Sequence, residues 1–323
     1  ASCDLGGVAA FRRFSEAARW ADLIHYHFPW PFEDLLHAVL RPSAPAILTY
    51  HSDIVRQRLL GRLCAPLTRA TLRSVSAIVA TSPAYAETSA LLASAETRDR
   101  VRVIPLGIEE RSYPRTGDDA VLRRAGINHD EPFFLFIGVL RYYKGLHTLV
   151  QAAASVKARI VIAGSGPEGD RLKEQVHRLG VRNVIFTGPV QDAEKVALYT
   201  HCHAFVLPSH LRSEAYGMVL VEASMFEKPL ISCEIGTGTS FVNINAETGL
   251  VVPPESPQEL AKAMNTLLND EALARQLGRK ARQRYEAVFS GPALGQAHAR
   301  LYHDVLRVAA REHVLEDSRH TDQ

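Results

Sequence analysis

The sequence has few cysteines, little net charge and no long apolar run, and each of these absences excludes a class of protein. Its four cysteines are scattered over 323 residues without paired spacing, which is typical of reduced thiols in the cytosol rather than of a disulfide framework. The net charge of +2 is too small to indicate a nucleic-acid partner. No apolar run approaches the roughly 20 residues that cross a bilayer. We therefore expect a cytoplasmic globular protein without a transmembrane helix.

The sequence instead contains two series of short apolar runs that end in polar or turn residues, as parallel strands do. The first series comprises residues 21–27, 45–51, 77–82 and 101–107. The second comprises residues 133–138, 158–164, 183–188, 204–209, 229–234 and 249–254. Segments with helical spacing separate the runs. The pattern predicts an α/β protein with two Rossmann-like, doubly wound domains that face each other across a cleft.

A polar stretch at residues 111–132 separates the two series and predicts the domain boundary. We expect a first domain over residues 1–128 and a second over residues 129–285. Helices over residues 286–323 are expected to cross back to the first domain. The first series has few strands for a nucleotide-type domain, so we expect the first domain to be incomplete.

Glu214 and Glu222 are the first candidates for a ligand site. An apolar helix is expected to begin after Gly217, and the free amide groups of its first turn suit a phosphate. Glu222 lies inside that apolar helix, where an unpaired carboxylate is costly, so it needs donors such as the hydroxyls of a ribose. Two isolated glutamates would ordinarily be a helix-terminal charge and a surface residue. The flanking sequence decides between these interpretations.

The stretch SEAYGMVLVEASMFEKPLI at residues 213–231 resembles the E-x7-E motif of the retaining GT-B glycosyltransferases, glycosyl transferases group 1. This family includes bacterial mannosyl- and rhamnosyltransferases of O-antigen and other surface polysaccharides. Further segments resemble the family in the same order, among them FIGVLRYYKG at 136–145 and IAGSGPEGD at 162–170. The resemblance implies a GT-B fold and a hexosyltransferase that uses a nucleotide-sugar donor without a metal.

The resemblance also implies roles for individual residues. Glu222 should bind the ribose and Glu214 the donor sugar, while Lys144 should neutralise the diphosphate as its charge develops. Val139 stands where the family commonly has Arg, which makes Arg141 a candidate for the same phosphate. The implied donor site comprises Gly138, Arg141, Lys144, Gly164, Gly166, Glu214, Ala215, Tyr216, Gly217, Met218 and Glu222, and the implied catalytic residues are His51, Lys144 and Glu214.

Histidines follow or end two strands of the first series. His25 and His27 lie on one face of a strand, which also suits a metal, but no cysteine or carboxylate with ligand spacing completes such a site. The resemblance implies that His51 faces the donor sugar and that His27 shapes the acceptor pocket, while His25 is expected to be a core residue. His201, Cys202 and His203 also look metal-like, but they run into a strand and are expected to pack.

The segment between Arg56 and Arg73 is basic, contains no acidic residue and has leucines at helical spacing. It predicts either an ordinary surface helix or a helix that contacts anionic lipid. Because related enzymes act on lipid-linked acceptors, the resemblance favours peripheral contact with the inner face of the cell membrane.

The function expected from the sequence is the retaining transfer of mannose or rhamnose from a GDP-sugar onto a glycan or lipid-linked acceptor. One alternative is an NAD(P)-dependent oxidoreductase, based on Gly164, Gly166 and Gly169 after a strand. That class needs an acidic residue at the end of the next strand, where Gly188 stands. A second alternative is a nucleotide-sugar-binding protein whose catalysis is impaired by truncation.

Overall fold

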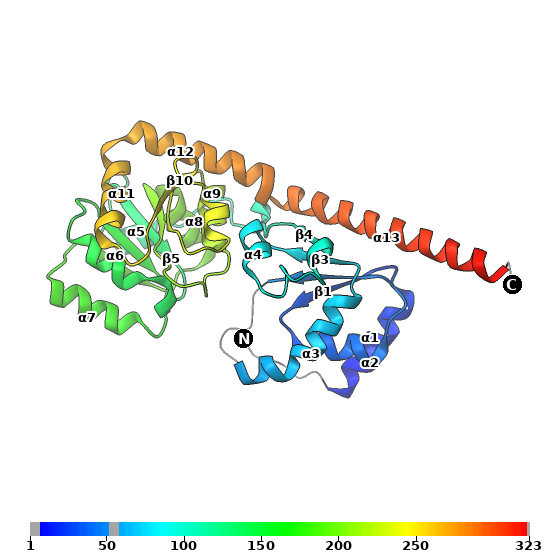
Figure 1. Ribbon diagram of the computed structural model, residues 1–323. Coiled ribbons are helices and arrows are strands. Elements are labelled where there is room, and N and C mark those ends of the chain that lie inside the picture. Colours follow the sequence, from blue (N-terminus) through cyan, green and yellow to red (C-terminus); the bar gives the residue numbers. More distant parts are fainter. Residues whose placement is uncertain (1–6, 52–57, 322–323) are drawn as a thin grey trace. The chain divides into compact units, whose positions relative to one another are not determined.

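The computed structural model describes residues 7–51 and 58–321 of the chain (Figure 1). The chain divides into two compact units. Unit 1 comprises Ala1–Pro105 and Gly295–Gln323, and unit 2 comprises Leu106–Leu294. Each unit is built on a parallel β-sheet with helical connections, so the predicted α/β fold class is confirmed.

Unit 1 contains a four-stranded parallel sheet in the order β1-β2-β3-β4. Its strands are β1 (Ile24–Phe28), β2 (Ala46–Tyr50), β3 (Ala77–Ala80) and β4 (Val101–Val103). Its helices are α1 (Val8–Trp20), α2 (Pro31–Leu40), α3 (Arg58–Ser74), α4 (Pro83–Thr88), the short η1 (Arg98–Arg100) and most of α13 (Gly291–Thr321). The two middle strands, β2 and β3, are buried along their whole length, which explains why they read as continuous apolar runs.

Unit 2 contains a six-stranded parallel sheet in the order β10-β9-β8-β5-β6-β7. Its strands are β5 (Phe133–Ile137), β6 (Arg159–Ala163), β7 (Val184–Gly188), β8 (Ala204–Leu207), β9 (Leu230–Cys233) and β10 (Gly249–Val252). Its helices are η2 (Glu110–Ser112), α5 (Ala120–Arg124), η3 (Tyr142–Lys144), α6 (Leu146–Ala153), α7 (Gly169–Leu179), α8 (Asp192–His201), α9 (Met218–Met225), α10 (Thr239–Val242), α11 (Pro257–Asn269), α12 (Glu271–Arg284) and η4 (Tyr285–Phe289).

The strand order of unit 2 reverses between β5 and β8. The chain runs outward from β5 to β7, then returns to pair β8 with the other edge of β5 and continues outward to β10. Ligands of doubly wound sheets bind beside the carboxyl ends of the strands at such a reversal. The loops that follow β5 and β8 are therefore the first place to look for a site.

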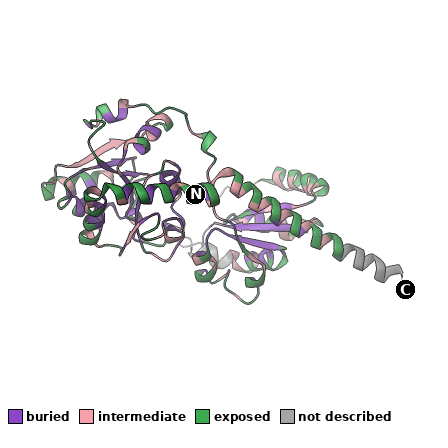
Figure 2. Ribbon diagram, turned by 90° about the horizontal axis from the view of Figure 1, so that it is seen from above, coloured by how far each residue is buried: buried purple, intermediate pink, exposed green. Residues whose placement is uncertain are grey.

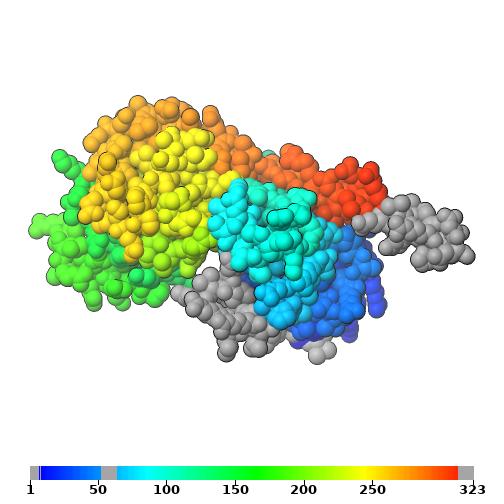
Figure 3. All heavy atoms as spheres, in the orientation of Figure 1, coloured from blue at the N-terminus to red at the C-terminus, as the bar shows by residue number. Residues whose placement is uncertain are grey.

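The core of unit 2 lies on both faces of this sheet. Strands β5 and β8 are buried throughout. Figure 2 shows buried residues in purple. Helix α12 forms part of the surface of the unit, visible in orange in Figure 3. It reaches the core through Leu277, which is fully buried. Burial of such side chains is the main favourable term in the stability of the unit.

No described helix combines the length and the apolar character needed to cross a membrane. For the basic segment predicted to contact lipid, the side chains of residues 52–63 lie outside the described part of the chain. Of its later arginines, Arg69 is exposed, whereas Arg73 donates two hydrogen bonds to Glu96 at 2.9 and 2.7 Å. Lipid contact by this segment stays a prediction.

Candidate active site

The reversal between β5 and β8 brings Lys144 and Glu214 together. Lys144 ends η3, in the loop after β5, and Gly145 follows in the left-handed conformation with φ of 68°. A Cβ atom on Gly145 would collide with the carbonyl oxygen of Pro208, just after β8. Only glycine lets the two loops approach this closely. Gly145 thus allows the loop after β5 to lie against the loop after β8.

Lys144 and Glu214 form a buried ion pair in which the Lys144 ammonium donates to Oε2 of Glu214. The two residues are 9% and 7% exposed. The hydroxyl of Ser209 donates to the same oxygen at 3.0 Å. No described residue donates a hydrogen bond to the other oxygen, Oε1, of Glu214. Because an ionised carboxylate offers about four acceptor positions, this oxygen is available to a ligand.

Helix α9 begins at Met218, four residues after this glutamate. Its N-cap residue is Gly217, with φ of 81°, and no side chain caps the helix. The amide of Leu220 donates to the carbonyl oxygen of Gly217 at 2.8 Å, whereas those of Met218 and Val219 have no acceptor among the described residues and carry partial positive charge. Such an end suits the phosphates of a nucleotide.

The remaining residues of this loop hold it in place. The carbonyl oxygen of Ala215 accepts from the amide of Gly238 at 2.9 Å. The Tyr216 hydroxyl donates to the carbonyl oxygen of Leu106 at 3.1 Å, and burial raises its pKa. Thr237 donates to the carbonyl oxygen of Glu214 at 2.8 Å. These contacts fix the backbone that presents Glu214 and the start of α9.

The predicted glycines bring the loops after β5 and β6 into backbone contact. Gly138 and Gly164 have φ of 155° and 128°, and a Cβ on Gly164 would collide with the carbonyl oxygen of Gly138. A Cβ on Gly166 would lie 2.6 Å from the backbone nitrogen and oxygen of Leu140. A Cβ on Gly169 would make only an ordinary contact, at 3.6 Å. Close packing of the two loops thus accounts for the first two glycines of the G-x-G-x-x-G pattern.

Arg141 lies in the same loop as Lys144. Its side chain is exposed and makes no hydrogen bond or ion pair with any described residue. The structure therefore leaves it available to a ligand, and its predicted phosphate contact stays a prediction.

Glu222 is 9% exposed, and three side chains of the chain itself satisfy it. Its Oε1 accepts from the Lys195 ammonium at 2.7 Å and the Tyr113 hydroxyl at 2.8 Å, and its Oε2 accepts from the Tyr199 hydroxyl at 2.7 Å. Burial, followed by the neighbouring Glu222 charge, raises the pKa of both tyrosines. Both phenols are thus neutral donors at neutral pH. About one acceptor position of the carboxylate remains for a ligand.

None of these three partners of Glu222 was predicted from the sequence. Lys195 and Tyr199 are four residues apart on α8, and that spacing places them on one face of the helix. The spacing was a usable signal that the two act together. Tyr113 comes from the segment before α5, and no local pattern connects it with Glu222.

The predicted histidines of unit 1 lie side by side, and their rings stack in sequence. His25 and His27 lie on one face of β1 with ring centroids 4.5 Å apart, and Nδ1 of His27 shares a hydrogen bond of 2.9 Å with Nε2 of His51. His25 is bonded to Thr49 at 2.7 Å and to Tyr302 at 2.8 Å, as befits a structural residue. Burial lowers the pKa of all three histidines, to about 4 for His25. They are therefore neutral at pH 7.

The expectation that residues 201–203 pack holds for two of the three. Cys202 is buried, and burial raises its pKa to about 12. His203 packs against Phe134 and donates to the carbonyl oxygen of Leu267 at 2.8 Å. His201 instead turns away from the strand, and its surroundings are described below.

Comparison with known proteins shows which family of proteins this sequence belongs to. Residues 118–284 match the family Glycosyl transferases group 1, and residues 4–111 match Glycosyltransferase Family 4. The chain belongs to the glycosyl transferases group 1 and is a glycosyltransferase. This membership decides against the NAD(P)-dependent oxidoreductase hypothesis.

Two curated relatives cover most of the chain. The D-rhamnosyltransferase WbpZ of Pseudomonas aeruginosa is 46% identical over 283 residues, which are 88% of this chain and 74% of that protein. The O-antigen chain mannosyltransferase C of Escherichia coli is 42% identical over 299 residues, which are 93% of this chain and 80% of that protein.

Solved structures agree on the architecture. The sucrose-phosphate synthase of Thermosynechococcus elongatus superposes with a TM-score of 0.73 at 26% identity, covering 93% of this chain and 79% of that one. HepE of Anabaena, solved in complex with UDP, superposes with a TM-score of 0.76 at 20% identity, covering 92% and 82%. With its two parallel α/β units, the chain has the GT-B fold, as predicted.

Proposed function

We propose that this chain is a retaining hexosyltransferase that moves mannose or rhamnose from a GDP-sugar onto a glycan or lipid-linked acceptor. Its place is the synthesis of O-antigen or a similar surface polysaccharide. The observation that carries the proposal is the buried Lys144–Glu214 pair beside the start of α9, with one glutamate oxygen left open. The choice of sugar and pathway follows the two relatives, a rhamnosyltransferase and a mannosyltransferase.

In this proposal the loops after β5 and β8 hold the diphosphate of the donor. Lys144 has three N–H donors and uses one on Glu214, so the others can neutralise the leaving diphosphate. The free amide groups that begin with Met218 donate to a phosphate oxygen. Arg141 adds a second positive charge from the same loop as Lys144. This positive charge takes the place of a metal ion in the reaction.

The two glutamates bind the neutral parts of the donor. Oε1 of Glu214 accepts a hydroxyl of the transferred sugar, while Lys144 and Ser209 hold Oε2. Glu222 accepts a hydroxyl of the ribose with its remaining position. Its three partners orient the carboxylate and spare it the cost of burial as an unpaired charge.

Transfer with retention needs no carboxylate nucleophile. The bond between C1 of the sugar and the phosphate oxygen breaks as the acceptor oxygen bonds to C1 on the same face, and the leaving phosphate takes the acceptor proton. His51 contacts the donor sugar as a neutral imidazole that is oriented by its hydrogen bond to His27. His27 in turn lines the acceptor pocket.

We place this activity at the cytoplasmic face of the cell membrane. A lipid-linked acceptor is anchored there, and exposed Arg69 on α3 offers positive charge to anionic headgroups.

A donor screen tests the proposal. The purified chain is titrated calorimetrically with GDP-mannose, GDP-rhamnose, UDP-glucose and ADP-glucose, and sugar transfer or hydrolysis is measured with each. The GDP-sugars should bind most tightly, and the product anomer, read by NMR, should keep the configuration of the donor. Binding of none of the four donors would contradict the assigned site, and an inverted product would contradict the mechanism.

Substitutions of Glu214 and Lys144 test whether these two residues act on the donor. Glu214→Gln and Lys144→Met should each lower turnover by about 100-fold or more, because each removes charge that acts on the donor. Glu174→Gln and Lys157→Met are matched controls, since both side chains are exposed on unit 2 away from these loops. Full activity in Glu214→Gln would remove the basis of the proposal.

A further inference from the structure

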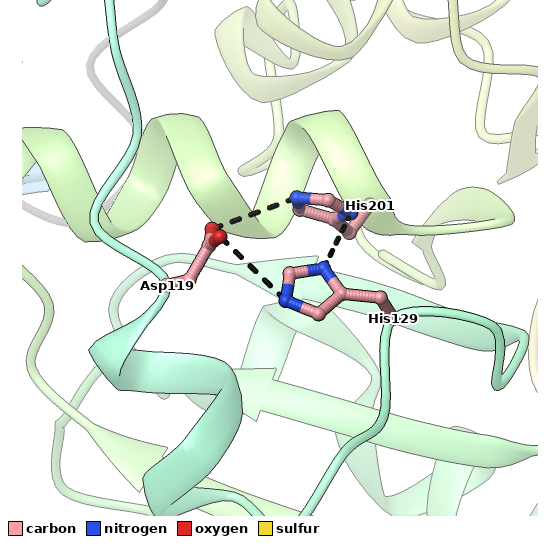
Figure 4. A group of neighbouring side chains, drawn as sticks. All are labelled: Asp119, His129 and His201. Atoms are coloured by element: carbon pink, nitrogen blue, oxygen red, sulfur yellow. Dashed lines mark hydrogen bonds and ion pairs between the residues drawn. The ribbon is translucent and has the colours of Figure 1, made fainter.

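Asp119, His129 and His201 come from three separate segments of unit 2 and converge on one point (Figure 4). Asp119 is the N-cap residue of α5, His129 lies between α5 and β5, and His201 is the last residue of α8. Because His129 and His201 each lie a few residues before a strand, the group sits at the amino edge of the sheet. The loops that carry Lys144 and Glu214 lie at the opposite, carboxyl edge.

The three side chains of the group lie within a few ångströms of one another. The Asp119 carboxylate lies 3.7 Å from Nε2 of His129 and 3.5 Å from Nε2 of His201, and the Nδ1 atoms of the two rings are 3.5 Å apart. One ligand atom from each residue lies within 4.8 Å of the other two. Two ligands of a tetrahedral zinc ion, each about 2.1 Å from the metal, are themselves about 3.4 Å apart. The short contacts use both nitrogens of each ring, so each histidine would turn one nitrogen toward a shared ion, and the three residues are near enough for this.

The contacts within the group are long, at 3.5–3.7 Å. An aspartate at a helix N-cap normally accepts a hydrogen bond from the first turn, but Asp119 makes no such bond and turns to the two histidines. The contact between the two Nδ1 atoms, at 3.5 Å, is at the limit of a hydrogen bond. A cation would give all three side chains a strong common partner.

A cation could also reach the group. Both histidines line a cavity of about 530 Å³ on this side of unit 2. Four carboxylates line the same cavity. Glu131 is paired with Arg159 and Glu271 with Arg275, whereas Asp130 and Glu227 form no ion pair with a described residue. The negative charge that remains for a cation is that of Asp119 together with the unpaired Asp130 and Glu227.

We propose that Asp119, His129 and His201 bind a divalent transition-metal ion of the zinc class, with solvent completing the coordination shell. Imidazole nitrogen and carboxylate oxygen are the ligands that such ions take in proteins. The ion joins the C-terminal end of α8 to the segment between α5 and β5. Since α8 also carries Lys195 and Tyr199, the ion steadies the helix that holds Glu222. It is structural and takes no part in the transfer, so the two proposals stand or fall separately.

Metal titration of the full, tag-free chain tests the site. The protein is stripped with a chelator, dialysed, and titrated with zinc and with cobalt. Bound metal is measured by elemental analysis and calorimetry, and stability by thermal unfolding. Compared with the wild type, His129→Gln, His201→Gln and Asp119→Asn should each lose one equivalent of bound zinc, or bind it about 100-fold or more weakly. Zinc should raise the unfolding temperature of the wild type more than that of these variants.

His177→Gln is the matched control, because His177 is an exposed histidine on α7 of the same unit. It should bind as much zinc as the wild type and gain the same thermal shift. Zinc bound by other histidines is present in every protein compared, so it does not change the difference between the wild type and the variants. The proposal is overturned if the wild type binds no zinc, or if the variants that fold retain the wild-type equivalent and shift. Using three variants ensures that the failure of one to fold does not decide the result.

Discussion

The ion pair between Lys195 and Glu222 gives the sharpest test of how unit 2 is held together. The Nζ–Oε1 distance is 2.7 Å, and the two side chains are 19% and 12% exposed. We consider the change Lys195→Met, which keeps the length of the side chain and removes its charge. Glu222 then retains only the two tyrosine hydroxyls as partners.

The expected cost follows from this burial. Removing one partner of a fully buried ion pair costs about 3–5 kcal/mol, because it leaves an uncompensated charge. Two hydroxyl donors remain here and some solvent reaches the pair, so we expect about 2–3 kcal/mol. For a unit of this size, each kcal/mol lowers the midpoint of thermal unfolding by roughly 2–4 °C. The unfolding temperature should therefore fall by about 4–12 °C.

A double-mutant cycle isolates the pair. Lys195→Met, Glu222→Gln and the double variant are unfolded thermally and in urea. In the Glu222→Gln background no buried carboxylate charge remains, so Lys195→Met should cost much less, and the coupling should be about 2 kcal/mol. The control is Lys262→Met, whose pair with Glu259 is exposed and spans 3.8 Å, so its cost should stay below about 0.5 kcal/mol. Additive effects at Lys195 and Glu222, within about 0.5 kcal/mol, would refute this reasoning.

Three further outcomes follow from the structure. Gly145→Ala should lower the free energy of unfolding of unit 2 by about 3 kcal/mol, measured in urea. Gly180 has a similar φ but open space around it, so Gly180→Ala should cost only about 1 kcal/mol. Equal costs for the two variants would contradict the close approach of the loops. Burial lowers the pKa of His25 from 6.5 to about 4, so on acidification the unfolded state binds a proton before the folded state does. The contribution of His25 to stability should therefore be full above pH 6.5 and be lost as the pH falls toward 4. In urea unfolding measured at several pH values, His25→Asn should reduce the loss of stability between pH 6.5 and 4. Under native conditions, a thiol reagent should label the half-exposed Cys64 well before Cys202, whose pKa burial raises to about 12; mass spectrometry of the labelled peptides gives the order.

The strands could be predicted because their signal is local. Of the ten strands in the described residues, nine lie inside a predicted apolar run and β1 extends one residue beyond its run, to Phe28. The division of the runs into four and six is that of the two sheets. Buried parallel strands must be apolar on both faces, so the pattern records burial directly. The resemblance of the segment from Glu214 to Glu222 likewise gave the family before any coordinates.

The glycines show where a sequence pattern was real but its cause was not visible. The G-x-G spacing at Gly164 and Gly166 suggested a dinucleotide. The tertiary structure gives another reason, because the loops after β5 and β6 touch backbone to backbone there. A glycine pattern shows that a side chain would not fit at those positions, but it does not show whether a ligand or another part of the backbone lies there.

By itself, then, the sequence determined the fold class, the family and the positions of Lys144, Glu214 and Glu222. Only the tertiary structure decided what those side chains contact. The reversal of strand order at β5 and β8 joins Lys144 to Glu214 and leaves one oxygen of that glutamate open. The partners of Glu222 come from as far away as Tyr113. Whether a residue is buried is reflected in its own polarity and can be predicted from the local sequence. Which side chains contact one another depends on the order of the strands in the sheet, and no local pattern gives that order.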